Sequence, residues 1–142
     1  RGTGHVGLGF LGNYGLKRGA VATSVGHDSH NLVVAGVCDE DMIVAGNRVL
    51  ENEGGLAIAV DGVVVGELPL TVAGLMSDLP AEKADWKLEE MKAKLGELGI
   101  QDGIDGFMTL AFVSLPVIPA IRVNTLGVVD VGRREIVDAV IE

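Results

Sequence analysis

Cysteine is almost missing from this chain of 142 residues, in which Cys38 stands alone. A single cysteine cannot form an intrachain disulfide, which is typical of proteins in a reducing compartment. The acidic run from Asp39 to Asp41 follows directly and opposes ionisation of the thiol. We therefore predict a cytoplasmic protein in which Cys38 is buried and unreactive.

Positive charge and long apolar runs are also scarce. The chain has 11 Lys and Arg residues against 20 Asp and Glu residues, a formal net charge of −9. Because nucleic-acid binding needs a clustered positive field, we expect no nucleic-acid partner. The longest strongly apolar stretch, Phe107–Pro119, has 13 residues and two prolines, too few for a membrane-spanning helix. We expect no membrane partner, and we interpret 107–115 as a core strand that runs into a bend at 116–119.

The chain lacks every short motif that would complete a catalytic site by itself. It contains no His-x-His, His-Glu-x-x-His, Cys-x-x-Cys, P-loop or Gly-x-Ser-x-Gly pattern, and only three histidines. A catalytic zinc usually takes three protein ligands, so an independent metal enzyme is hard to build from this set. Residues 7–12 match Gly-x-Gly-x-x-Gly, but a turn at 13–15 follows where a dinucleotide site needs a helix. We reject that match.

Apolar periodicity divides the chain into short strands and about two main helices. Helical spacing of apolar residues predicts one helix from Asp39, as its N-cap, to Gly54 and a second from Pro80 to Gly99. Asp61-Gly62 between two apolar runs predicts a hairpin. The expected strands are 5–10, 20–25, 31–37 (buried on both faces), 56–60, 63–68 and 107–115, with one or two more after 123. These elements predict an α+β (α/β-like) fold, a single compact domain with a mixed β-sheet.

The segment 27–31 carries the densest group of reactive side chains, which are His27, Asp28, Ser29, His30 and Asn31. It lies between two predicted strands, in the kind of loop where α/β proteins place their chemistry. Imidazole near neutral pH binds divalent metals or moves a proton, and a carboxylate orients it or binds the same ion. A hydrogen-bonded turn, in which Asp28 and Asn31 satisfy backbone groups, explains the same residues. The residues alone leave both alternatives open.

The sequence resembles the C-terminal domain of bacterial and archaeal adenine deaminase over almost its whole length. The matching stretches are 7–10, 15–20, 27–31, 33–36, 54–56, 68–70, 73–77 and 115–120, in the family's order. The combination of His-Asp-Ser-His-Asn at 27–31 with Ala-Gly-Leu-Met-Ser at 73–77 is the most specific part. Trp86 and the tail after Arg122 depart from the family pattern.

The resemblance implies a parent enzyme that hydrolyses adenine to hypoxanthine and ammonia in purine salvage. In that family an amidohydrolase-type barrel, N-terminal to this domain, carries a binuclear centre of manganese or iron. The chain begins at Arg1, without Met and inside a Gly-rich stretch, so we expect a domain boundary or processing site with further sequence before it. We assign residues 1–142 to the C-terminal domain, with the barrel outside this chain, and we expect a homo-oligomer.

The resemblance also suggests that loop 27–31 closes over the active site of the barrel. The candidate catalytic residues are His27, Asp28 and His30, with His27 and His30 as candidate metal ligands beside ligands from the barrel. Ser29, Asn31 and Ser77 would line the substrate or support those side chains. One alternative is a non-catalytic assembly or dimerisation domain that uses the 107–119 segment and Trp86. Another is a free-standing small-molecule binding protein, which would need a pocket within this chain.

Overall fold

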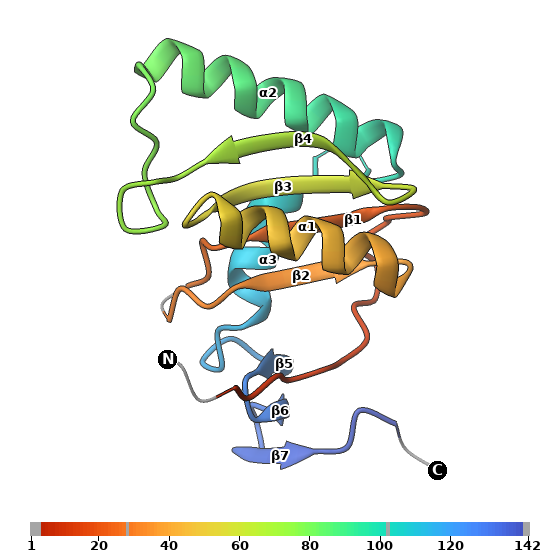
Figure 1. Cartoon of the computed structure of the whole chain (residues 1–142). Coiled ribbons are helices and arrows are strands. Elements are labelled where there is room, and N and C mark those ends of the chain that lie inside the picture. Colours follow the sequence, from red (N-terminus) through yellow and green to blue (C-terminus); the bar gives the residue numbers. More distant parts are fainter. Residues whose placement is uncertain (1–3, 28, 102, 141–142) are drawn as a thin grey trace.

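The computed structural model describes residues 4–27, 29–101 and 103–140, and its main element is a four-stranded sheet. The strands follow the order β2-β1-β3-β4, and each neighbouring pair is antiparallel (Figure 1). They are β1 (Ala20–Thr23), β2 (Val33–Gly36), β3 (Gly55–Val60) and β4 (Val63–Pro69). The helices are α1 (Asp39–Glu51), α2 (Ala81–Glu97) and α3 (Gly106–Val113). A second antiparallel sheet contains β5 (Ile121–Asn124), β6 (Gly127–Asp130) and β7 (Glu135–Val137).

Alternating side-chain size along β3 sets which helix packs on which face of the main sheet. Leu56 and Ile58 pack in a cluster with residues of α2 and α3, whereas Ala57 and Ala59 pack with α1. Successive side chains of a strand point to opposite faces, so this strand gives the sheet one bulky face and one shallow face. The alanine face lets α1 approach closely, and Figure 1 shows α1 in front of the sheet with α3 behind it.

Both long helices confirm the predictions made from apolar spacing. In α1 the residues Ala45 and Val49 are buried against the sheet, while Leu50 points outward and is 64% exposed. Asp39 is the first helical residue rather than the N-cap, which is Cys38 and makes no side-chain capping bond. In α2 the buried residues continue the predicted spacing; they are Met91, Leu95 and, directly after the helix, Leu98.

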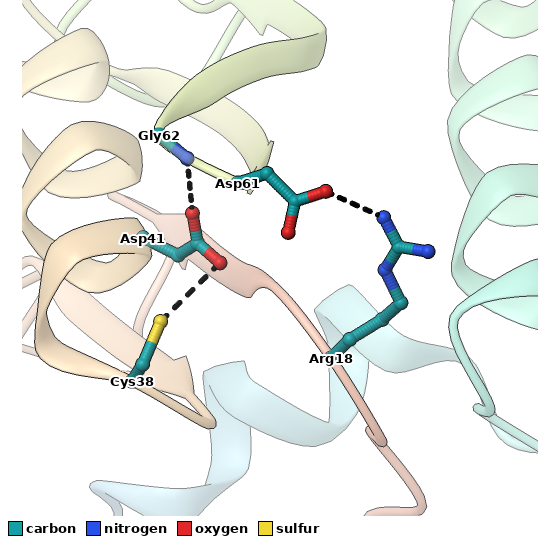
Figure 2. A network of polar contacts seen from close by, with 5 residues as sticks. All are labelled: Arg18, Cys38, Asp41, Asp61 and Gly62. Atoms are coloured by element: carbon teal, nitrogen blue, oxygen red, sulfur yellow. Dashed lines mark hydrogen bonds and ion pairs between the residues drawn. The ribbon is translucent and has the colours of Figure 1, made fainter.

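A buried carboxylate connects the start of α1 to the predicted β3–β4 hairpin, which the structure confirms (Figure 2). Asp41 is 3% exposed and its Oδ1 accepts a hydrogen bond from the Gly62 backbone N–H at 2.7 Å. Cys38 Sγ lies 3.4 Å from Asp41 Oδ2. Cys38 is exposed, so the prediction of a buried cysteine is wrong. Cys38 is the N-cap of α1, and the residues of α1 that are buried begin only at Asp41, so the N-cap itself stays at the surface.

Asp41→Asn is expected to destabilise the domain by about 1.5–3 kcal/mol at pH 7, the usual net value of a hydrogen bond to a charged group. The Gly62 N–H bond, with a smaller contribution from Cys38, holds the pKa of Asp41 below its ordinary value. The charged form therefore stabilises the fold above about pH 4, and this contribution disappears as the pH falls through the folded-state pKa. Urea unfolding followed by circular dichroism should show that the two proteins become equally stable once the pH is below the folded-state pKa of Asp41.

The matched control for that experiment is Asp61→Asn in the same hairpin. Asp61 pairs with Arg18 at 2.8 Å, but the two side chains are 82% and 60% exposed. Solvent screens such a pair, so this substitution should cost at most about 0.5 kcal/mol. An Asp41→Asn cost no larger than the Asp61→Asn cost, or one that does not shrink in acid, would refute the assigned role of Asp41.

The strand predicted at 107–115 is wrong, because most of this segment forms α3. Asp105 caps the helix by accepting a hydrogen bond from Met108 N at 2.9 Å. Phe107, Leu110 and Ala111 recur at helical spacing and are buried in the core. The run is apolar on all sides, so its pattern alone does not separate a helix from a buried strand.

The strand predicted at 5–10 is also wrong. Residues 4–11 form an extended arm without strand pairing, next to the second sheet. Gly9 approaches the side chain of Val123, and Gly7 approaches the backbone of Asn124. Thr125 and Leu126 form the turn between β5 and β6, and three strands follow residue 120 where one or two were expected.

The predicted α+β class is confirmed; among the described residues, three helices accompany two antiparallel sheets, where about two main helices and one mixed sheet were expected. The strand expected at 31–37 is β2, an edge strand whose residues are half-buried or exposed; it was expected to be buried on both faces. Helix α1 covers one face of β2 only in part, which explains the difference. Over the described ranges, no helix combines the length and the apolar character needed to cross a membrane.

Candidate functional site

Loop 24–32 joins β1 to β2 at one end of the main sheet and contains the 27–31 motif. Its backbone is fixed in two places: His27 N–H donates to Ala111 O at 2.7 Å, and His30 N–H donates to Gly26 O at 2.6 Å. Within the motif, Asn31 Nδ2 donates to Ser29 Oγ at 3.3 Å. Asp28 lies outside the described residues, so its predicted role stays a prediction. The loop is therefore anchored to α3 as well as to its own turn.

The imidazole of His27 is exposed and stacked on an aromatic ring. Its centroid lies 5.5 Å from that of Phe112, with an angle of 19° between the ring planes. Phe112 is the last residue but one of α3 and is 37% exposed. Stacking on this ring, together with the backbone bond to Ala111, restricts where the His27 side chain points. His27 thus presents an oriented imidazole at the surface, which suits proton transfer to a bound molecule.

Phe112 is a site residue that the sequence prediction missed. The strand expected at 107–115 gave no reason to place it beside His27. A signal was present: Asp105 stands just before the apolar run, Asp is a favoured N-cap residue, and a helix from Gly106 buries Leu110 and Ala111 while leaving Phe112 at the boundary.

His30 differs from His27 because it is partly buried and has a left-handed backbone, with φ of 49°. Its Nδ1 atom is buried and makes no hydrogen bond to the described residues. Ser114 Oγ, also buried and unpaired in the described part of the chain, would lie 3.5 Å from a Cβ at Gly26. The backbone N–H of His30 donates to the Gly26 carbonyl, so His30 and Ser114, which carry the two unpaired atoms, both lie next to Gly26. Buried polar atoms without partners are uncommon in folded proteins, and a catalytic role is one explanation for them.

Ser24 connects loop 70–78, which contains the family-like stretch 73–77, to the same end of the sheet. Its Oγ donates to Gly74 O at 2.6 Å and accepts from Gly55 N–H at 2.7 Å. The backbone of Gly54 is packed directly on that of Gly74. Figure 1 shows loop 70–78 and loop 24–32 projecting from the same end of the strands. Ser77 accepts a hydrogen bond from Leu79 N at 3.2 Å, so its described contact shapes the turn that leads into α2.

Comparison with known proteins identifies the family. The sequence profile described as "Adenine deaminase C-terminal domain" matches residues 1–135. This chain belongs to the adenine deaminase C-terminal domain family. The family assignment suggested by the motif at 27–31 is therefore confirmed. The domain carries that motif on the loop between β1 and β2, beside the end of α3.

Two relatives named adenine deaminase show how much of a longer protein this domain represents. It is 49% identical to "Adenine deaminase 2" of Carboxydothermus hydrogenoformans over 135 residues, which are 95% of this chain and 24% of the relative. It is 53% identical to "Adenine deaminase" of Kosmotoga olearia over 124 residues, which are 87% of this chain and 21% of that relative. The adenine deaminase C-terminal domain thus spans about a quarter of the length of these curated relatives.

The donor set of this C-terminal domain does not by itself fit a metal centre. Within 4–27, 29–101 and 103–140, no three His, Cys, Asp or Glu side chains gather closely enough to hold a metal ion. The ring of His27 lies against Phe112 at the surface, whereas Nδ1 of His30 is buried. The two imidazoles therefore lie in different surroundings. Metal binding by His27 and His30 stays a prediction that requires ligands from outside this chain.

Proposed function

We propose that this domain is the C-terminal part of a cytoplasmic adenine deaminase, an enzyme that hydrolyses adenine to hypoxanthine and ammonia in purine salvage. The observation that carries the proposal is the identity of 49% and 53%, over almost the whole chain, to proteins that bear this name. The proposed enzyme includes a preceding amidohydrolase barrel that holds a manganese or iron centre. Such a centre would supply activated water when bound.

Within that enzyme, we propose that loop 27–31 forms one wall of the active site. Hydrolysis at the purine ring removes a proton from water and delivers one to the departing amine. An imidazole performs both steps near neutral pH. His27 supports this role best, because its ring is exposed and is oriented by Phe112. Asp28 would act beside it, with Ser29, Asn31 and Ser77 as polar residues along the same wall.

His30→Asn in the full-length enzyme tests whether the loop acts on the reaction. Asparagine tolerates the left-handed backbone of residue 30, so the substitution removes the imidazole without straining the loop. We expect kcat/KM for adenine to fall by about 10-fold or more, at the low end of losses for removed acid–base or positioning groups. Ammonia release and bound metal are measured together on the same preparations.

Asp61→Asn is the matched control, since Asp61 also has a left-handed backbone, with φ of 53°, but lies in the β3–β4 hairpin, outside loop 24–32. It should leave turnover close to that of the parent enzyme. If His30→Asn also leaves both turnover and metal content unchanged, loop 27–31 has a folding or docking role and the active-site proposal is wrong.

A second candidate function is assembly of the parent enzyme, and one observation favours it. Trp86 on α2 is 66% exposed, and aromatic residues are enriched at protein interfaces. The other expected contributor, the segment 107–119, supplies less than expected because Phe107 and Leu110 lie in the core of this domain. The assembly proposal therefore concerns the outer surface of α2 and is compatible with an active-site role for loop 27–31.

A further inference from the structure

The N-terminal arm, residues 4–11, lies against the second sheet with glycines on its inner side. A Cβ on Gly9 would lie 2.7 Å from Val123 Cγ2 and 3.3 Å from Val128 Cγ2, and a Cβ on Gly7 would overlap the Asn124 carbonyl. Figure 1 shows the arm passing beside β5 and β6. There is no room for a Cβ between the arm and the sheet at these two positions. Glycine therefore allows the backbone of the arm to lie directly on the sheet.

The outer side of the arm is an apolar ridge formed by Val6, Leu8 and Phe10. These side chains are 78%, 71% and 87% exposed. They alternate with the two inner glycines, as expected for an extended chain whose successive side chains point to opposite sides. Exposed large apolar side chains grouped in this way are characteristic of interaction sites.

We propose that this apolar ridge docks against the preceding domain of the same polypeptide. The inference rests on the proposed function, in which the domain is the C-terminal part of a longer enzyme. The relatives are about four to five times as long as the matched region, and the family is described as a C-terminal domain. In that enzyme the preceding polypeptide would join the domain at the N-terminal side of the arm. Each residue spans at most about 3.6 Å, so a preceding domain joined by a short connection would lie next to the ridge.

Hydroxyl-radical footprinting of the full-length enzyme, read by mass spectrometry, tests this docking surface. Two matched pairs remove differences in intrinsic reactivity: Leu8 with Leu50, which are 71% and 64% exposed in the domain, and Val6 with Val63, which are 78% and 61% exposed. Leu50 lies on α1 and Val63 on β4, away from the arm. Leu8 and Val6 should be labelled at least about 5-fold more slowly than their partners, as expected for side chains at the dry core of an interface.

Equal labelling within each pair would overturn the proposal, whether all four residues are labelled or all four are protected. Protection of Leu8 and Val6 that is lost when the enzyme is diluted to monomers would assign the ridge to a second copy, which also overturns it. The result does not depend on turnover. An enzyme that is inactive on adenine but protected at the ridge refutes the proposed function alone, and an active enzyme with a freely labelled ridge refutes the docking alone.

Discussion

His27→Ala in the full-length enzyme is expected to lower kcat/KM for adenine by about 100-fold or more, the usual loss when a positioned acid–base group is removed. The fold should not change, because the described contact of the ring is its stacking on Phe112 at the surface. The backbone bond from His27 N–H to Ala111 O does not need the side chain. Steady-state kinetics together with thermal unfolding separate these effects, and the melting temperature should stay within about 2 °C.

Phe112→Ala supplies the control that tests whether His27 acts through its orientation. Removing the stacking partner frees the imidazole, and we expect kcat/KM to fall by about 10-fold through loss of positioning. In the double variant the two losses should not multiply, since Phe112 has nothing left to orient. If Phe112→Ala lowers activity equally with and without His27, the aromatic ring acts separately. If His27→Ala is fully active, the proposed wall of the active site does not include this side chain.

The parts of the fold that could be predicted from the sequence are those with a local signal, either regular apolar spacing or a turn-forming residue pair. In α2 the apolar residues recur every three or four positions, and the buried ones, Met91 and Leu95, are those that the spacing selects. Asp61-Gly62 predicted the β3–β4 hairpin because a tight two-residue turn needs a positive φ at both positions. Asp and Gly tolerate such angles, and the observed values are 53° and 77°. Local chemistry decided these elements, so sequence reasoning was sufficient for them.

The parts that were missed depend on long-range contacts. The run 107–115 is apolar except for Thr109 and Ser114, so its spacing does not separate a helix from a buried strand, and the packing of Leu110 against the bulky face of the main sheet is what places this helix in the core. The arm alternates glycine with large apolar residues like a strand, yet it meets the side chains of Val123 and Val128 instead of pairing with a neighbouring strand. Neither outcome follows from periodicity over a short window.

The candidate site shows the same division. The residue types in 27–31 and their place after a core strand were visible in the sequence. The stacking of His27 on Phe112 was not, because it joins residues 85 positions apart through α3. The link from Ser24 to Gly74 was likewise hidden, since a serine at a strand end has no distinctive pattern. Sequence therefore predicted the loop, and tertiary structure was needed to define its surroundings.

The largest effect on stability is expected from a glycine beneath the candidate site. Gly54→Ala should destabilise the domain by about 3 kcal/mol or more, combining backbone strain with a steric clash. Gly54 has φ of 132°, where residues with a side chain are strained. A Cβ there would overlap the Cα of Gly74 and lie 3.1 Å from Leu70 O. Both obstacles are backbone, so no side chain can rotate away to make room.

Gly96→Ala is the matched control, because it is the same substitution at a glycine with open space around its Cβ position and a place inside α2. Alanine is favoured over glycine in helices, so this variant should be neutral or up to about 1 kcal/mol more stable. Urea unfolding of both variants measures the difference directly. Since Gly54 packs on Gly74 and Ser24 bonds to the same residue, Gly54→Ala should also loosen loop 70–78, seen as faster amide hydrogen exchange there. A Gly54→Ala protein as stable as Gly96→Ala would mean that the contact between Gly54 and Gly74 does not hold loop 70–78 in place. The inference that loops 24–32 and 70–78 are fixed to each other at the candidate site would then be wrong.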